Sequence, residues 1–494
     1  MTTIVSSRVL IGMEIHVELA TESKMFSAAP NAASPNQYNA KPNTLVDPVV
    51  MALPGSLPVI NRRAVSMSMR VGLALNCTIA RFTKWDRKNY YYPDLPKGYQ
   101  ISQFDKPLCM DGVIEIGEER KPVKIIRAHL EEDTGKLGHE LPGGEHYDGS
   151  LVDLNRAGTP LLEIVSAPDL HSAEDAVAFA REVRDICRYL GVTQGIMQKG
   201  HVRFEPNINM IITTDDGVEH ATPIVEIKNL NSFKAIAGAI EYETTRQVEA
   251  WLKDGKVMGP NAKSTRGWDD DKQVTIMQRE KEDAHDYRFF PDPDLVPLTI
   301  SNEWINEVNE LIPELPASRR RRYQAQYKLS LKDAQALTAE PGLCNFYERC
   351  VKKSGNGAES AKWLLNAGAK YANENKCEVN ELGISPEQLA GLIKLRTENK
   401  VGSSAADKLF GLLCKCEQSA EILADEQGLL QVTDESAVDT WIEGAIEAQP
   451  QAADDVRSGK EAAIGRLVGE VMKRSGGAAD AKSVKEKLLQ QLRG

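Results

Sequence analysis

The sequence lacks the motifs by which many nucleotide-binding and hydrolytic enzymes are recognised. Its 494 residues contain no G-x-x-x-x-G-K-[ST] phosphate loop and no G-x-G-x-x-G fingerprint, so neither a P-loop enzyme nor a dinucleotide-binding fold is expected. There is no Gly/Ser-rich nucleophile segment of the amidase type, and none of the eight cysteines lies in a recognisable glutaminase setting. The chain is therefore expected to have no hydrolytic source of ammonia of its own.

Membrane-spanning and export signals are missing as well. No run of about 18 uncharged apolar residues occurs, and the N-terminus has no basic segment followed by an apolar one. The cysteines show no zinc-ligand spacing and fit free thiols in a reducing compartment, so a cytoplasmic protein is expected. A formal net charge of −11 argues against nucleic-acid binding over the whole surface. A nucleic-acid partner would require a local basic patch.

The chain changes character near residue 297. All eight histidines lie between His16 and His285, together with the alternating, strand-like segments. After the string FFPDPDLVP (residues 289–297) the composition becomes rich in Ala, Glu, Lys and Leu, which favours helices. Since 41% hydrophobic content is enough for ordinary cores, we predict a sheet-containing first part and a helical remainder.

The C-terminal segment combines an amphipathic helix with positive charge. Apolar residues recur at i, i+3, i+4, i+7 and i+8 from Ile464 to Met472, which is one face of a helix. From residue 457 to the C-terminus nine Lys/Arg stand against four Asp/Glu, a local +5 that leaves −16 for the remainder. This polarity fits a small RNA-docking module, and a solvated terminal helix bundle explains it nearly as well.

The string IGMEIHVEL (residues 11–19) alternates strictly between apolar and polar residues. This period predicts a half-buried β-strand in which Glu14, His16 and Glu18 share one face, roughly 6.5–7 Å apart in succession. Carboxylate oxygen and neutral imidazole nitrogen both bind divalent cations, so Glu14 and His16 can converge on one ion. The alternative is a solvated strand face.

Further carboxylates lie where a core is expected. Glu163 stands between branched apolar residues in LLEIV (161–165), where a carboxylate is costly unless it is paired or bound to a metal. Glu131 and Glu132 are adjacent, so in a strand at most one of them points to a shared site. Singly, each fits an ion pair; together they form the inventory of a Mg²⁺ site for phosphoryl transfer.

A tyrosine-rich string, YYYPDLPKGYQ (90–100), is predicted as a loop by its prolines and glycine. Its rings could stack on a nucleotide base or seal a core edge, and the sequence does not choose between these. Residue types alone thus predict a Mg²⁺-dependent transferase or ligase with a basic helical tail.

Eight strings, in order along the chain, resemble the B subunits of aspartyl/glutamyl-tRNA(Asn/Gln) amidotransferases. The resemblance covers essentially the whole chain. The strings are IGMEIHVEL (11–19), KMFS (24–27), DRKNY (86–90), YPDLPKGYQISQ (92–103), HLEED (129–133), DLNRAGTPLLEIV (153–165), KNLNSF (228–233) and DYRFF (286–290).

The resemblance implies an α+β fold in three parts. An antiparallel-sheet cradle domain is expected over residues 1–297, an all-α helical domain over 298–412, and a small helical tail of YqeY type over 413–494.

The resemblance also implies an ATP-dependent carbon–nitrogen ligase with glutamine as amide donor. Such a protein phosphorylates the side-chain carboxylate of Glu on tRNA(Gln) or Asp on tRNA(Asn) with Mg²⁺ as cofactor. Ammonia from a separate amidase, the A subunit, then arrives through a tunnel and displaces the phosphate, and a small C subunit completes a heterotrimer. The missing nucleophile segment agrees with this division of labour.

Carried over to this chain, the resemblance assigns catalytic and binding residues. Lys97 would lie at the mouth of the ammonia tunnel. The implied Mg²⁺ ligands and catalytic groups are Glu14, His16, Glu132 and Glu163. Contacts to tRNA or ATP are further expected at Tyr92, Arg156, Arg203, Arg288, Lys473 and Arg474.

The chain departs from the family pattern at two places. Where the family commonly has MEEGSLRCDANVS, residues 197–209 read MQKGHVRFEPNIN, so a direct metal role for Glu205 is not expected, although a role through a neighbouring ligand is. In the tail the family's GKANP becomes GGAAD (476–480), which removes a lysine contact to tRNA.

Two other interpretations stay open. The chain could be a non-catalytic tRNA-binding scaffold whose acid clusters are structural. It could also be the archaeal-type sibling of these B subunits, which acts only on Glu-tRNA(Gln) and carries an extra inserted domain for which 494 residues leave little room. The sequence does not decide between the two misacylated tRNAs as substrates.

Overall fold

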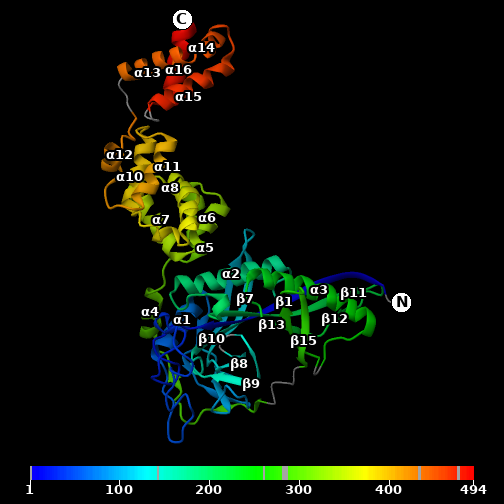
Figure 1. Cartoon of the computed structure of the whole chain (residues 1–494). Coiled ribbons are helices and arrows are strands. Elements are labelled where there is room, and N and C mark those ends of the chain that lie inside the picture. The colour runs from blue at the N-terminus through cyan, green and yellow to red at the C-terminus, as the bar shows by residue number, and fades with distance from the viewer. Residues whose placement is uncertain are drawn as a thin grey trace. The chain divides into compact units, whose positions relative to one another are not determined.

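The computed structural model describes residues 3–141, 144–259, 262–280, 287–431, 435–475 and 479–493. The chain forms two compact units, Met1–Pro316 and Ala317–Gly494, which are described separately (Figure 1).

The first unit is built on one large sheet with the strand order β15-β14-β13-β11-β1-β10-β7-β5-β4-β16, and β2, β6 and β12 attached beside this path. Its strands are β1 (Ile4–Glu18), β2 (Thr78–Ile79), β4 (Asp86–Asn89), β5 (Tyr99–Ser102), β6 (Cys109–Ile116), β7 (Lys121–Glu132), β10 (Pro160–Ser166), β11 (Val202–Thr214), β12 (Glu219–Ala221), β13 (Val225–Lys228), β14 (Ser264–Asp269), β15 (Val274–Glu280) and β16 (Phe290–Pro291). Two small two-stranded sheets accompany it: β3 (Phe82–Thr83) with β17 (Leu298–Thr299), and β8 (Lys136–Glu140) with β9 (His146–Asp153).

The expected α+β class, with an antiparallel sheet followed by helices, is confirmed. Neighbouring strands of the large sheet pair antiparallel, and the exception is the parallel pair β13–β14. Helix α3 lies between β13 and β14 in the chain. Such a crossover connection permits parallel pairing, whereas tight turns produce antiparallel neighbours.

Strand β1 confirms the strand predicted from the alternating string. Ile11, Met13, Ile15 and Val17 are at most 1% exposed on one face. Helices α1 (Arg62–Ala74), α2 (Ala173–Tyr189) and α3 (Phe233–Asp254) contribute to the same core and cover this apolar face. The polar residues between them therefore lie together on the other face of the sheet.

The first compact unit continues past residue 297. Helix α4 (Asn302–Glu310) buries Val308, and Trp304 packs against the core of this unit. The Pro/Asp-rich segment 289–297 is tied to the sheet, since β16 pairs with β4 and Arg87 forms ion pairs with the aspartates that follow. The domain limits 1–297, 298–412 and 413–494 remain predictions.

The second unit is helical throughout its described residues. Its helices are α5 (Pro316–Tyr327), α6 (Leu331–Thr338), α7 (Pro341–Ser354), α8 (Gly357–Trp363), α9 (Ala369–Asn375), α10 (Pro386–Thr397), α11 (Ser403–Leu413), α12 (Ala420–Glu426), α13 (Glu435–Ala448), α14 (Pro450–Arg457), α15 (Ile464–Arg474) and α16 (Ala481–Arg493). A separate core joins the last four helices, and the buried Ile464, Leu467 and Val471 confirm the predicted amphipathic helix.

Two absences expected from the sequence can be compared with the structure. All eight cysteines are free thiols, and Cys187 is buried as a core residue. Within the ranges that the structure describes, no helix has the length and apolar character that crossing a membrane requires.

We expect Val17→Ala to lower the free energy of unfolding by about 2 kcal/mol, because it removes two carbons from a site without solvent exposure. Val5, in the same strand, is 68% exposed, and Val5→Ala should change stability by less than about 0.5 kcal/mol. Guanidinium titration of both variants beside the wild-type chain measures the difference. Equal losses would contradict the assignment of the buried face.

Candidate active site on the polar face of the sheet

The central strands place histidines and carboxylates side by side on the polar face. His16 on β1 lies opposite Glu163 on β10 and opposite Arg203 on β11. Glu163 in turn lies opposite His129 on β7. Directly opposed residues of antiparallel strands share a face. Four neighbouring strands thus contribute polar side chains to one area.

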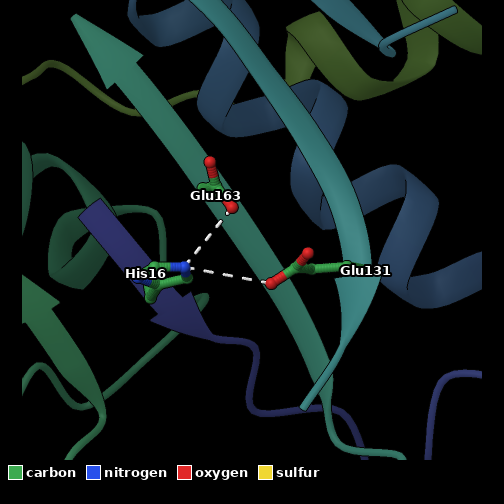
Figure 2. Close-up of side chains that lie close together, drawn as sticks. All are labelled: His16, Glu131 and Glu163. Atoms are coloured by element: carbon green, nitrogen blue, oxygen red, sulfur yellow. Dashed lines mark ion pairs between the residues drawn. The ribbon is translucent and has the colours of Figure 1, made fainter. Parts of the chain in front are cut away.

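The first cluster consists of His16, Glu131 and Glu163 (Figure 2). One potential ligand atom from each lies within 4.8 Å of the others. The Nε2 atom of His16 is 3.4 Å from Oε2 of Glu163 and 3.9 Å from Oε1 of Glu131. The side chains of His16, Glu131 and Glu163 are only 14%, 5% and 15% exposed, so the group is shielded from bulk water.

The charges in this cluster are strongly coupled. Burial lowers the pKa of His16, but the hydrogen bond to Glu163 and the charges of Glu205 and Glu163 outweigh it and raise that pKa to about 9. Burial and the charge of Glu163 raise the pKa of Glu131 to about 7. The cluster therefore favours an additional positive charge, either a proton or a cation.

His129, on strand β7, lies beside this cluster. Its side chain is 3% exposed, and its Nε2 atom lies 3.6 Å from Oε2 of Glu163 and 3.9 Å from Oε2 of Glu131. Burial lowers the pKa of His129 to about 4, so the ring is neutral near pH 7. Sequence reasoning did not assign a role to His129, although its position two residues before Glu131 in a strand already placed both on one face.

The donor set of the first cluster fits a divalent cation. One imidazole and two carboxylates suit Mg²⁺ or Mn²⁺. Among the described residues, no lysine or arginine forms an ion pair with Glu131 or Glu163; their ion pairs are with the histidines. Burial makes the ionised form of Glu131 costly, as its raised pKa shows, and a bound cation would remove that cost.

A second cluster holds Glu14, which the resemblance had grouped with His16. Ligand atoms of Glu14, Glu205 and Glu226 lie within 4.8 Å of one another. Here Lys228 supplies positive charge, 2.7 Å from Glu205 and 3.5 Å from Glu226. The two clusters adjoin, because Nδ1 of His16 lies 3.9 Å from Oε1 of Glu205.

Glu132 belongs to a third group and not to the His16 cluster. Its carboxylate forms an ion pair with Lys97 and accepts a hydrogen bond from the backbone N–H of Ile101 at 3.0 Å. The sequence argument that only one of the adjacent pair Glu131 and Glu132 points to a shared site therefore holds. In the structure Glu131 lies beside His16, whereas Glu132 pairs with Lys97, and the role of Glu132 as a Mg²⁺ ligand remains a prediction.

The Lys97–Glu132 pair lines a small hollow of about 20 Å³, room for about one water molecule. Lys24, Asp133 and Gly158 also line it. Lys24 is completely buried, and its ammonium donates hydrogen bonds to the carbonyl oxygens of Ala157 (2.6 Å) and Leu154 (3.3 Å).

Two arginines predicted to contact tRNA or ATP lie at the edge of the polar face. Arg203 pairs with Glu18 at 3.0 Å and with Asp133 at 2.9 Å, and Arg156 lies 3.6 Å from Asp133. Although burial opposes it, the charges of Arg156 and Arg203 lower the pKa of Asp133 to about 2. Both arginine side chains remain about one quarter exposed, at 26% and 27%.

The remaining predicted contacts are exposed or belong to the other unit. Tyr92 is 59% exposed between β4 and β5, and Arg288 is exposed with its carbonyl bound to Asn89. Lys473 and Arg474 lie on α15 of the second unit. Asp286 of the DYRFF string and residues 476–478 of the altered tail string lie outside the described residues.

Comparison with known families agrees with this architecture. The first unit matches the family model described as "GatB/GatE catalytic domain" over residues 9–306, and the second matches "GatB domain" over residues 345–492. The sheet unit thus falls in a class of catalytic domains, and the helical unit matches the class described as "GatB domain".

Relatives similar over nearly the full length identify the family. Three proteins that bear the name of the B subunit of aspartyl/glutamyl-tRNA(Asn/Gln) amidotransferase are 43% identical (Thermomicrobium roseum), 42% identical (Trichlorobacter lovleyi) and 41% identical (Caldanaerobacter subterraneus subsp. tengcongensis). Each alignment covers 98% of this chain and 98–99% of the relative. The chain belongs to the family of aspartyl/glutamyl-tRNA(Asn/Gln) amidotransferase B subunits.

Burial of Lys24 gives a testable dependence of stability on pH. Burial lowers the pKa of Lys24 from 10.5 to about 8, so between these pH values the unfolded chain binds more protons than the folded chain and stability rises with pH. Lys24→Met lacks this contribution. Between pH 8 and pH 10.5 we expect the free energy of unfolding of the wild type to rise, relative to that of the variant, by on the order of 1–3 kcal/mol.

Denaturant titrations at the two pH values measure this gain. Lys106→Met, at an exposed position of the same unit, is the control and should follow the wild type. Parallel curves for Lys24→Met and the wild type would contradict the assignment.

Proposed function

We propose that this chain is the component of a tRNA-dependent amidotransferase complex that activates the side-chain carboxylate of Glu-tRNA(Gln), Asp-tRNA(Asn) or both with ATP. The observation that carries the proposal is the His16–Glu131–Glu163 cluster, whose carboxylates lack a fixed lysine or arginine partner among the described residues. It lies in the unit that matches a family of catalytic domains.

The reaction has two steps in this proposal. A carboxylate oxygen of the aminoacyl group attacks the γ-phosphorus of ATP, ADP leaves, and an acyl phosphate forms. Ammonia then attacks the acyl carbon, phosphate leaves, and the nitrogen loses a proton to give the amide. A Mg²⁺ ion held by His16, Glu131 and Glu163 would neutralise phosphate charge.

The chain's own residues position the reactants. His16 and Glu163 are fixed opposite each other by the β1–β10 register. The side chains that would hold the cation, and through it the phosphates, therefore keep a fixed geometry. Arg156 and Arg203, which keep part of their surface exposed, supply positive charge at the edge of the same face. Tyr92 is available on the neighbouring loop for stacking on a base.

The nitrogen must come from elsewhere, since the chain has no recognisable glutaminase nucleophile segment. We assign its supply to an amidase that hydrolyses glutamine, the A subunit of a heterotrimer that also holds a small C subunit. The hollow beside Lys97 and Glu132 has the size for one ammonia molecule. The ammonium group of Lys97 and the carboxylate of Glu132, which pair at its wall, could open or close the passage.

The basic C-terminal segment is assigned to tRNA binding. Lys473 and Arg474 end helix α15, within the segment from residue 457 that carries the local +5. Phosphate contacts add affinity without chemistry. The tail is therefore proposed to hold the tRNA while the sheet unit performs the reaction.

The two other interpretations are less well supported. A pure scaffold does not account for the match of residues 9–306 to a catalytic-domain family. The archaeal-type sibling would require an inserted domain, whereas alignments with relatives named as B subunits cover 98% of this chain and nearly all of each relative.

The central test is Glu163→Gln in the assembled complex. The amide keeps the shape of the side chain but removes a charge that would hold the cation, so tRNA-dependent ATP hydrolysis should fall about 10²-fold. Glu118→Gln makes the same chemical change on an exposed turn and should leave the rate unchanged. Wild-type ATP hydrolysis by a correctly folded Glu163→Gln complex would refute the assignment.

Lys97→Ala tests the proposed nitrogen passage. The assembled complex should still hydrolyse glutamine and phosphorylate the aminoacyl-tRNA, because neither step uses the hollow. Amide formation from glutamine should fall several-fold, while added ammonium chloride should restore product, since the acyl phosphate still forms and ammonia from solution can attack it. Lys106→Ala, at an exposed site, is the control. If ammonium rescues no better than glutamine, Lys97 has no role in the passage.

A further inference from the structure

A cavity of about 440 Å³ lies beside helix α3, at the end of the large sheet formed by β13, β14 and β15 (Figure 1). Its lining includes Val225 of β13, Ala250 of α3 and Met277 of β15. Small-molecule sites in proteins commonly have volumes of about 300–1,000 Å³. The volume therefore suits a ligand of the size of a metabolite.

The cavity and the acidic clusters lie on opposite faces of the sheet. Val225 is 3% exposed and lines the cavity, whereas Glu226, the next residue of β13, belongs to the second acidic cluster. Consecutive residues of a strand point to opposite faces. A ligand in the cavity would thus not enter the proposed reaction site.

The lining of the cavity carries more positive than negative charge. Arg246, Lys256 and Lys263 stand against one carboxylate, that of Asp254. Neither lysine forms an ion pair with any residue that the structure describes. In a chain with a formal net charge of −11, such a surplus at a concave site favours a negatively charged ligand.

A buried carboxylate holds Arg246 in place at the cavity. The Nε and Nη2 atoms of Arg246 each donate a hydrogen bond of 2.8 Å to Glu243, which is completely buried. This leaves Nη1 without a partner among the described residues. Arg266 lies 3.3 Å from the same carboxylate, and burial and the charge of Arg246 lower the pKa of Arg266. Two guanidinium groups thus share one acid, and an anion at Nη1 would balance the excess.

We propose that this cavity binds a small organic anion that is not a substrate of the proposed function. Its phosphate, sulfonate or carboxylate group would contact Arg246, Lys256 and Lys263. Its apolar body would lie against Ala250 and Met277. The site would hold this ligand without a metal ion, because the protein itself supplies the positive charge.

Dye binding to the full-length chain in the presence of EDTA tests the proposal. Anilinonaphthalene sulfonate is an organic anion of the proposed kind, and phenylnaphthylamine has the same rings without the charge. With divalent cations removed, the acidic clusters repel anions, so the sulfonate dye reports on a site with its own positive charge. The wild-type chain should bind this dye and release it to uridine monophosphate or benzoate. The competitor that acts at the lower concentration identifies a phosphate or a carboxylate ligand.

Two variants separate the charge of the cavity from its space. The double variant Lys256→Glu, Lys263→Glu reverses the charge at two exposed positions. It should weaken binding of the sulfonate dye roughly tenfold or more and leave binding of the uncharged dye unchanged. Ala250→Phe fills part of the cavity from α3 without a change of charge and should weaken binding of both dyes.

Lys234→Glu is the matched control. It makes the same change of charge at an exposed position in the first turn of α3, about 18 Å along the helix from Arg246. This variant should bind both dyes as the wild type does. Thermal unfolding of each variant checks that it is folded.

Wild-type binding of the sulfonate dye by both the double variant and Ala250→Phe would overturn the proposal. Equal losses of the two dyes in the double variant would overturn it as well, because charge would then not be the cause. If neither uridine monophosphate nor benzoate displaces the dye from the wild-type chain, the site accepts the dye alone and the proposal is wrong.

Discussion

More carboxylates share one half-buried sheet face than can be ionised there without cations beside them. Burial raises the pKa of Glu131 and of Glu18 to about 7 each, which shows the cost directly. Lys228, Lys97 and Arg203 offset that cost at three places on the face. The arrangement of the site follows from how this negative charge is compensated.

Compensation divides the face into areas with different uses. Where lysine or arginine pairs with the carboxylates, the protein's own side chains supply the balancing positive charge. Where the partners are the histidines His16 and His129, positive charge is not fixed, and a cation from solution can enter. That difference separates the proposed phosphoryl-transfer site from its equally acidic neighbours, and it would not be visible from a count of carboxylates.

Local patterns predicted individual strands and helices, whereas the change of composition near residue 297 does not coincide with the end of the first compact unit at Pro316. The strand around residues 11–19 and the helix from Ile464 both follow from periodicity, which depends only on backbone geometry. The segment 289–297 has the composition of a boundary, yet β16 pairs with β4 and α4 packs on the same core. Such long-range pairing leaves no trace in local composition.

The sequence by itself determined the family, the fold class and a set of acids and histidines on strand-like segments, because these are properties of residue order. Only the tertiary structure decided which of them meet. The register of β7 against β10 turns Glu131 toward His16 and sends Glu132 to Lys97, and the pairing of β1 with β11 places Glu14 beside Glu205. A strand fixes the side on which a residue points, but the neighbouring strands fix what it faces.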